Sequence, residues 1–178
     1  MKKYLELTFW QKITHFFIVP FLFFIPAMIV IDLFKIFATN SYAGLRSVNE
    51  LLMVSLPFLV LGIAFIFIQK RRLTFKIIDI KYTNDQFDET VRRTVDDLNW
   101  KIEHNNKNLF RAYRGSNWTG SWGEMITIIK EDNRLYLNSI CDPNRMSSVV
   151  SYGWNKKNLK TFIIHLKAVV KEQNVDNE

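Results

Sequence analysis

The sequence predicts an α+β protein in which a two-helix transmembrane hairpin precedes a small cytosolic domain. Residues 16–31 and 51–68 contain no charged side chain, and a helix needs about 20 apolar residues to cross a hydrocarbon core about 30 Å thick. From residue 73 onward the chain changes to short alternating and amphipathic segments in the order βαββββα. We therefore divide it into a membrane anchor, residues 1–72, and a cytosolic domain, residues 73–178.

The two transmembrane helices are expected over about residues 13–37 and 51–69. A cleaved signal peptide is the alternative for the first, because Ser41 and Ala43 imitate a small-residue cleavage site. The apolar segment is longer than the roughly 7 to 15 residues of a signal-peptide core, which favours a retained span.

Positive charge is concentrated beside the spans. Residues 1–72 carry eight Lys and Arg against three acidic residues, whereas the rest of the chain carries sixteen against fourteen. Lys and Arg near span ends remain cytoplasmic, and tryptophan favours the headgroup level. Both termini are therefore predicted to be cytoplasmic in a multi-pass protein. A richness in Lys, Asn, Ile and Phe suggests an AT-rich bacterial genome, so we expect a bacterial inner membrane. The residues expected to flank the membrane are Lys70, Arg71, Arg72 and Trp10.

The domain is expected to begin with a strand and a helix. The apolar alternation changes phase at Ile77 and Ile78, which predicts a strand over residues 75–82 with a bulge there. The pattern Thr83-Asn84-Asp85-Gln86 is a capping box that starts a helix ending near Asn99. The buried stripe of this helix is predicted to be Phe87, Val91, Val95 and Leu98.

Four strands and a second helix are expected to follow. Residues 100–104 and 109–114 form one predicted hairpin, residues 125–129 form a central strand, and residues 135–140 pair with it. Asn155 is the expected cap of the last helix. We predict a mostly antiparallel sheet of about five strands with both helices on one face. The apolar stripe of the last helix is Leu159, Phe162, Ile163, Leu166, Val169 and Val170.

No catalytic, metal or cofactor site is predicted. The single cysteine, Cys141, excludes an internal disulfide and a multi-thiolate metal site. The three histidines share no ligand spacing. The glycine-rich loop over residues 115–123 lacks the ending of a phosphate-binding loop and precedes a strand rather than a helix.

Lysines are unusual in the first turn of the last helix, where the helix dipole disfavours cations. Four of its lysines fall within about 60° of one another on a helix. An ordinary solvated flank is one interpretation; a surface that binds anionic lipid headgroups, with a tryptophan at the interface, is the other. The residues of this predicted anion-binding or lipid-binding surface are Lys156, Lys157, Lys160, Lys167, Lys171 and Trp154.

The functional expectation is a non-enzymatic interaction or regulatory module near the inner leaflet. Its expected partners are the bilayer, anionic lipid headgroups, and a protein partner or further copies of the chain. Nucleic acid is not expected, because the excess positive charge lies beside the spans and not on the domain. The alternative is a small oligomeric transporter or membrane enzyme that uses Asp32, Lys35 and His15 of the first span.

Overall fold

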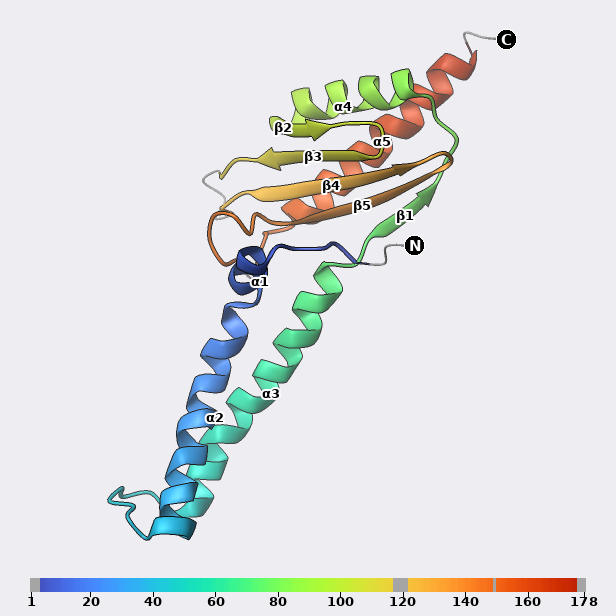
Figure 1. Ribbon diagram of the computed structural model, residues 1–178. Helices are drawn as coiled ribbons and strands as arrows, with labels where there is room; N and C mark the ends of the chain where they lie inside the picture. Colours follow the sequence, from blue (N-terminus) through green and yellow to red (C-terminus); the bar gives the residue numbers. More distant parts are fainter. Residues whose placement is uncertain (1–3, 117–121, 149, 176–178) are drawn as a thin grey trace.

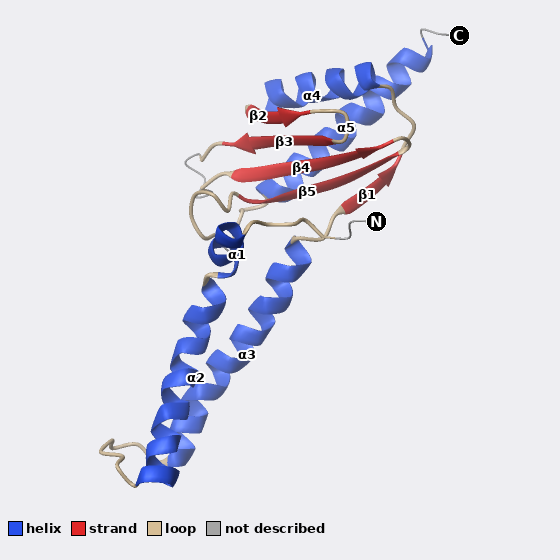
Figure 2. Ribbon diagram, viewed as in Figure 1, coloured by secondary structure: helices blue, strands red, loops and turns tan. Residues whose placement is uncertain are grey.

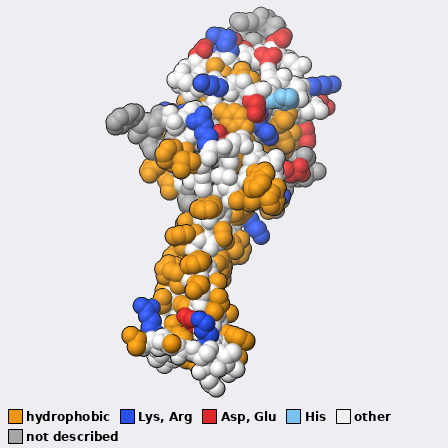
Figure 3. Space-filling view, turned by 60° about the vertical axis from the view of Figure 1, so that its left-hand side comes forward, with side chains coloured by type: hydrophobic (Ala, Val, Ile, Leu, Met, Phe, Trp, Pro, Cys, Tyr) orange, Lys and Arg blue, Asp and Glu red, His pale blue; other side chains and the backbone are white. Residues whose placement is uncertain are grey.

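The computed structural model describes residues 4–116, 122–148 and 150–175, and it places a long helical hairpin at one end of an α+β domain (Figure 1). Two helices are long and apolar enough to cross a membrane, Ile18–Thr39 and Val48–Arg72. The first consists of α2 (Ile18–Phe34) and a π-helical turn (Lys35–Thr39), and the second is α3 (Val48–Arg72). Many hydrophobic side chains of this hairpin are exposed, as the face drawn in Figure 3 shows.

The first span begins later than the sequence predicted, because a separate helix precedes it. α1 (Phe9–Phe16) starts at a capping box in which Thr8 and Gln11 bond to each other's backbone N–H groups. Pro20 has no N–H to donate to the carbonyl of Phe16, which favours a break at this point. Residues 9–16 therefore form a helix of their own at the end of the hairpin.

The two long helices approach closely at Gly62. This residue is buried, and a Cβ atom built on it would lie 2.6 Å from Cε2 of Phe23. Small residues allow helices to pack closely in a membrane, where no hydrophobic effect drives them together. Gly62 therefore sets the spacing between α2 and α3.

Replacing Gly62 with leucine is expected to destabilise the hairpin by about 1–3 kcal/mol, because the new side chain must displace the Phe23 ring. Thermal unfolding of the full chain in detergent, followed by circular dichroism, measures this effect. The Phe23→Ala background removes the obstructing ring, so Gly62→Leu should destabilise the hairpin less in that background. An equal loss of stability in the two backgrounds would contradict the close packing of α2 and α3 at Gly62.

The domain contains one antiparallel sheet of five strands in the order β1-β5-β4-β3-β2. The structure confirms an α+β fold with such a sheet. The predicted bulge in β1 is wrong: Ile77 lies opposite Tyr136 and Ile78 opposite Leu135 without a shift, and each belongs to a different apolar face. The register shifts instead within β2. The strands are β1 (Lys76–Asp79), β2 (Trp100–Asn105), β3 (Leu109–Arg114), β4 (Glu124–Glu131) and β5 (Arg134–Cys141).

Two helices, α4 (Asn84–Leu98) and α5 (Trp154–Val175), cover one face of the sheet (Figure 2). The Thr83 capping box is present as predicted, and Asn99 ends α4 in the left-handed conformation. Asn155 is not the cap of α5, because the helix already begins at Trp154 and the Asn155 side chain accepts a bond from the Ser139 hydroxyl. The core between helices and sheet includes Phe87, Phe110, Ile126, Leu135, Phe162 and Leu166.

The amino-terminal segment packs against the opposite face of the sheet. Leu5 and Leu7 are buried beside Met125 and Tyr136 in a second, smaller core. The N–H of Leu5 donates to the carbonyl of Leu73, 2.8 Å away. We call residues 4–8 the strap, since they cross the domain before α1 begins. The charge pattern of the sequence predicts only a membrane anchor for this segment.

Candidate functional site

Several buried or partly buried polar contacts lie at the junction where the hairpin meets the domain. His15 and Gln69 are both buried there and bond to each other's backbone. The Gln69 amide donates to the His15 carbonyl at 2.7 Å, and Nε2 of His15 lies 3.1 Å from the Gln69 carbonyl. Because a carbonyl only accepts, Nε2 must carry the hydrogen.

The His15 imidazole is held neutral at this junction. Burial lowers the pKa of His15 below the usual 6.5, the bond to the Gln69 carbonyl opposes this shift, and the positive charge of Arg72 adds to it. A neutral ring with a hydrogen on Nε2 can make the observed bond at neutral pH. The His15–Gln69 pair therefore joins the end of α1 to the end of α3 without introducing a charge.

A second group of bonds joins α3 to the sheet. The Asn138 amide of β5 donates to the carbonyls of Arg72, at 2.9 Å, and Thr74, at 3.1 Å. These carbonyls lie where α3 ends, so Asn138 satisfies backbone groups that a helix end leaves unpaired. α3 consequently continues into β1 through a short connection that is bonded to the strap on one side and to β5 on the other.

The third connection involves α1 and the loop after β5. The Gln11 amide donates to Oδ1 of Asn144 at 2.9 Å, and the Asn144 amide donates to the Tyr113 hydroxyl at 3.1 Å. The loop itself is folded by the Asp142 carboxylate, which accepts from the Asn144 N–H. Together the three connections hold the domain on the hairpin at several separate points.

A row of polar residues crosses the strap face of the sheet beside this junction. Arg111 lies opposite Thr127, and Thr127 lies opposite Asn138. Among the described residues, Nε of Arg111, Oγ1 of Thr127 and Oδ1 of Asn138 are buried atoms without a hydrogen-bond partner. These three atoms are candidates for further polar contacts, since buried polar groups are nearly always bonded.

The predicted membrane-flanking residues lie at the junction end of the hairpin. Lys70, Arg71 and Trp10 are exposed. Arg72 is partly buried and donates to the side-chain oxygen of Gln69 at 3.3 Å. Trp10 packs edge-on against Phe9, with the ring centroids 5.5 Å apart. All four therefore occupy one end of the helical hairpin.

The five lysines predicted to bind anions are all exposed on α5, but they are spread along its length. α5 starts near the junction and runs away from it (Figure 1), so Lys156 and Lys157 lie at its near end. From Lys156 to Lys171 the helix rises about 22 Å. The structure therefore brings only the first lysines close to the hairpin.

Trp154 is partly buried instead of being displayed to solvent. The guanidinium carbon of Arg114 lies 3.3 Å from the centre of a Trp154 ring, and Nζ of Lys157 lies 4.3 Å from it. Such stacking of cations on an aromatic ring is attractive. Arg114 also forms an ion pair with Glu124 at 2.9 Å, and both of these side chains are buried. No local pattern in the sequence predicts this cluster.

The environment of Cys141 makes its thiol less acidic. Cys141 is buried, and this burial raises the pKa of its thiol, which disfavours the reactive thiolate. The loop over residues 115–123 lies partly outside the described residues. The described part of the chain contains no group of three or more His, Cys, Asp or Glu side chains suited to a metal ion.

The residues of the transporter alternative are not brought together. Asp32 and Lys35 pair at 3.6 Å near the turn of the hairpin. His15 lies at the opposite end, bonded to Gln69. Seventeen helical residues rise about 25 Å, so the histidine and the ion pair cannot share one polar site.

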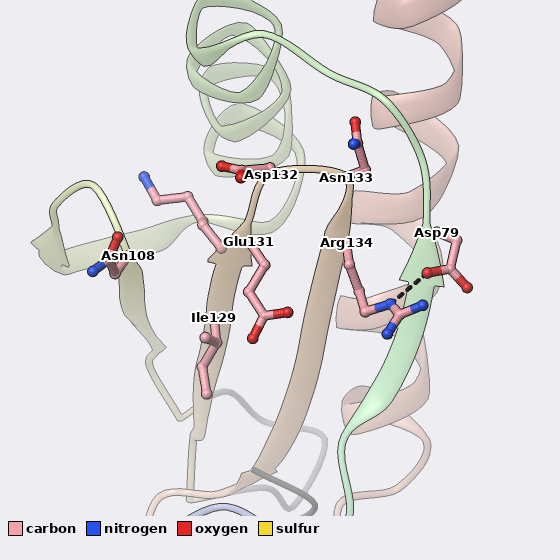
Figure 4. Close-up of a pocket in the computed structure, with 8 residues that line it drawn as sticks. Asp79, Asn108, Ile129, Glu131, Asp132, Asn133 and Arg134 are labelled. Carbon is pink, nitrogen blue, oxygen red and sulfur yellow. Dashed lines mark hydrogen bonds and ion pairs between the residues drawn. The ribbon is translucent and has the colours of Figure 1, made fainter. Parts of the chain in front are cut away.

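A cavity lies at the other end of the sheet, around the β4–β5 turn. It measures about 650 Å³, and its side chains extend from β1, β4, β5 and the β2–β3 turn (Figure 4). Arg134 pairs with Asp79, and Glu131 accepts from the Tyr136 hydroxyl. The first of these contacts pairs two opposite charges of the lining, and the second is a hydrogen bond to the Glu131 carboxylate. The lining residues are Asp79, Asn108, Ile129, Lys130, Glu131, Asp132, Asn133 and Arg134.

Comparison of the chain with protein-family models, curated proteins and solved structures found no match.

Proposed function

We propose that this chain is an integral protein of a bacterial inner membrane that holds a non-enzymatic interaction module in a fixed orientation at the cytosolic surface. The observation that carries the proposal is the junction. The His15–Gln69 pair, the bonds from Asn138 to the end of α3, and the strap all connect hairpin and domain. A domain bonded in this way presents the same surface to the cytosol whenever the hairpin is inserted.

The shape and charge of the hairpin support the proposed topology. The Leu5–Leu73 hydrogen bond keeps the strap and the start of the domain at the same end of the hairpin. Lys70, Arg71 and Arg72 occupy that end, and such residues favour the cytoplasmic side. A non-enzymatic role is supported by the Arg134–Asp79 ion pair in the cavity at the β4–β5 turn and by the raised pKa of the buried Cys141 thiol.

Cysteine labelling tests the topology. In a Cys141→Ser background, we expect Ser41→Cys to react with an impermeant maleimide in intact cells, because residue 41 lies in the connection between the spans. Ile102→Cys, on the exposed edge strand β2, should react only after permeabilisation. Reaction of Ile102→Cys in intact cells would overturn the topology.

An insertion tests whether the fixed orientation matters. We expect a photo-crosslinking residue at position 102 to form a defined adduct with a protein partner in the membrane. A flexible insert of about eight Gly and Ser residues after Arg72 should abolish that adduct while the domain stays folded at the membrane. A substitution of Asn106 with glycine, in the exposed β2–β3 turn, serves as a control that leaves the junction intact. The proposal is contradicted if the same adduct still forms after the insertion. It is also contradicted if the crosslinking residue forms no adduct with a protein at any exposed position tested.

A further inference from the structure

The apolar face of α1 points away from the protein. Phe9, Trp10 and Ile13 are exposed, whereas Gln11 and His15 on the other side of the helix bond to the domain and to α3. A surface helix of a soluble protein has the opposite arrangement, with its apolar stripe facing the core. A helix with an outward apolar face beside a membrane span matches those that lie in the membrane interface.

The loop after β5 places a second apolar group beside this helix. Met146 is 52% exposed. Its loop is held against α1 by the bond that the Gln11 amide donates to Asn144, and against β3 by the bond that Asn144 donates to Tyr113. A groove of about 430 Å³ lies between the loop and the helices. It is lined by Ile13, Thr14, Phe17, Ile18, Met146 and Ser147.

The groove is continuous with the apolar surface of the first span, because Ile18 both lines the groove and begins α2. Figure 3 shows hydrophobic side chains continuing from the hairpin onto the base of the domain. Two basic residues are next to lining residues in the chain: Lys12 precedes Ile13 and is exposed, and Arg145 precedes Met146. Half of the Arg145 side chain is exposed, and its Nε lies 3.4 Å from the carboxylate of Asp142. Apolar groups bordered by cations are complementary to an anionic phospholipid.

We propose that α1 and the Met146 loop form a lipid-binding surface that seats the domain in the leaflet. An acyl chain of an anionic phospholipid occupies the groove between Ile13 and Met146, and its phosphate lies at the level of Lys12 and Arg145. The proposal rests on the membrane location proposed above, but it adds a site of contact outside the two spans. The partner that binds this surface is therefore the membrane and not a protein.

Spin labels test the surface in the full chain, reconstituted into phosphatidylglycerol-containing vesicles in a Cys141→Ser background. Met146→Cys is compared with Ile102→Cys, since Met146 and Ile102 are similarly exposed, at 52% and 50%, but Ile102 lies on the edge strand farthest from the junction. Phe24→Cys, an exposed position of α2, reports insertion of the hairpin. Collision rates with oxygen, which concentrates in lipid, and with a water-soluble nickel complex are measured for each label.

The oxygen-to-nickel ratio should be on the order of threefold higher at Met146 than at Ile102, with Phe24 higher still. If the label at Met146 gives the same ratio as the label at Ile102 while the label at Phe24 still gives a high ratio, the lipid-binding surface is wrong but the membrane anchor is supported. If the label at Phe24 also gives the ratio of Ile102, both proposals are wrong.

A second measurement identifies the lipid. Native mass spectrometry of the full chain should retain phosphatidylglycerol, and Ile13→Ser with Met146→Ser should reduce the retained lipid on the order of threefold. The control variant, Ile102→Ser with Ile164→Ser, changes two residues elsewhere in the domain whose exposure is similar to that of Ile13 and Met146. It should leave the amount of retained lipid unchanged. Retention of phosphatidylcholine equal to that of phosphatidylglycerol, or no response to Lys12→Gln with Arg145→Gln, would overturn the assignment of an anionic lipid.

Discussion

Replacing Glu124 with glutamine is expected to lower the free energy of unfolding of the domain by about 3–5 kcal/mol, because it leaves the buried guanidinium of Arg114 without its carboxylate. The Glu124 side chain is 0% exposed and that of Arg114 is 7% exposed, with 2.9 Å between Oε2 and Nη1. Arg114 is also fixed over Trp154, so it cannot move into water without giving up that stacking. Urea unfolding of the full chain in detergent, followed by tryptophan fluorescence, measures the loss.

Two controls separate the buried charge from the substitution itself. The double variant Arg114→Met with Glu124→Met removes both charges, and it should recover most of the stability, as replacement of a buried pair by apolar side chains commonly does. Asp96→Asn breaks the exposed pair between Arg92 and Asp96 and should change stability little. If Glu124→Gln lowers the free energy of unfolding no more than Asp96→Asn does, the importance of the buried ion pair for stability is contradicted.

Elements with local signals were predictable from the sequence. The Thr83 capping box starts α4 because its two reciprocal bonds involve residues only three apart. The continuous apolar run after Glu124 predicted the central strand, since β4 is covered on both faces. Charge-free stretches likewise predicted the two long apolar helices. Each of these features can be deduced from a short window of the chain.

The junction could not be predicted in this way, because its bonds join residues far apart. His15 and Gln69 are 54 positions apart, and Asn138 is 66 positions from Arg72. One signal was available: Leu5, Glu6 and Leu7 alternate in polarity as an extended segment with one buried face does. The lysines around this segment instead favour its interpretation as the charged flank of a span.

For the predicted lysine surface too, the sequence predicted positions within one helix but not the contacts of that helix with other elements. Helical spacing placed Lys156, Lys160, Lys167 and Lys171 on neighbouring positions of α5, and the structure leaves these side chains exposed. Spacing could not show that Arg114, from β3, would stack on Trp154. Nor could it show that α5 leads away from the hairpin (Figure 1). Lipid binding by these lysines stays a prediction.

Replacing Leu7 with aspartate is expected to release the strap from the sheet. The described contacts that hold the strap on the sheet include the buried side chains of Leu5 and Leu7 and the Leu5–Leu73 hydrogen bond. The strap can therefore detach instead of burying the new charge, and the cost is set mainly by the lost contacts of Leu5 and Leu7. Full burial of a leucine contributes about 1.5–3 kcal/mol, which gives about 3–6 kcal/mol for the pair. Hydrogen exchange in the full chain should show faster exchange of the Leu5 and Leu73 region, while α4 and α5 remain protected.

Release of the strap would also remove one of the connections that fix the domain on the hairpin. Distances between spin labels on Lys70 and on Lys101, both exposed, should then broaden, although the sheet remains folded. Leu7→Met is the matched control, because a volume-conserving apolar change costs less than about 1.5 kcal/mol and should leave the distances narrow. If Leu7→Asp and Leu7→Met give the same distances, the strap does not contribute to orientation, and the remaining bonds of His15, Gln69 and Asn138 must hold the domain alone.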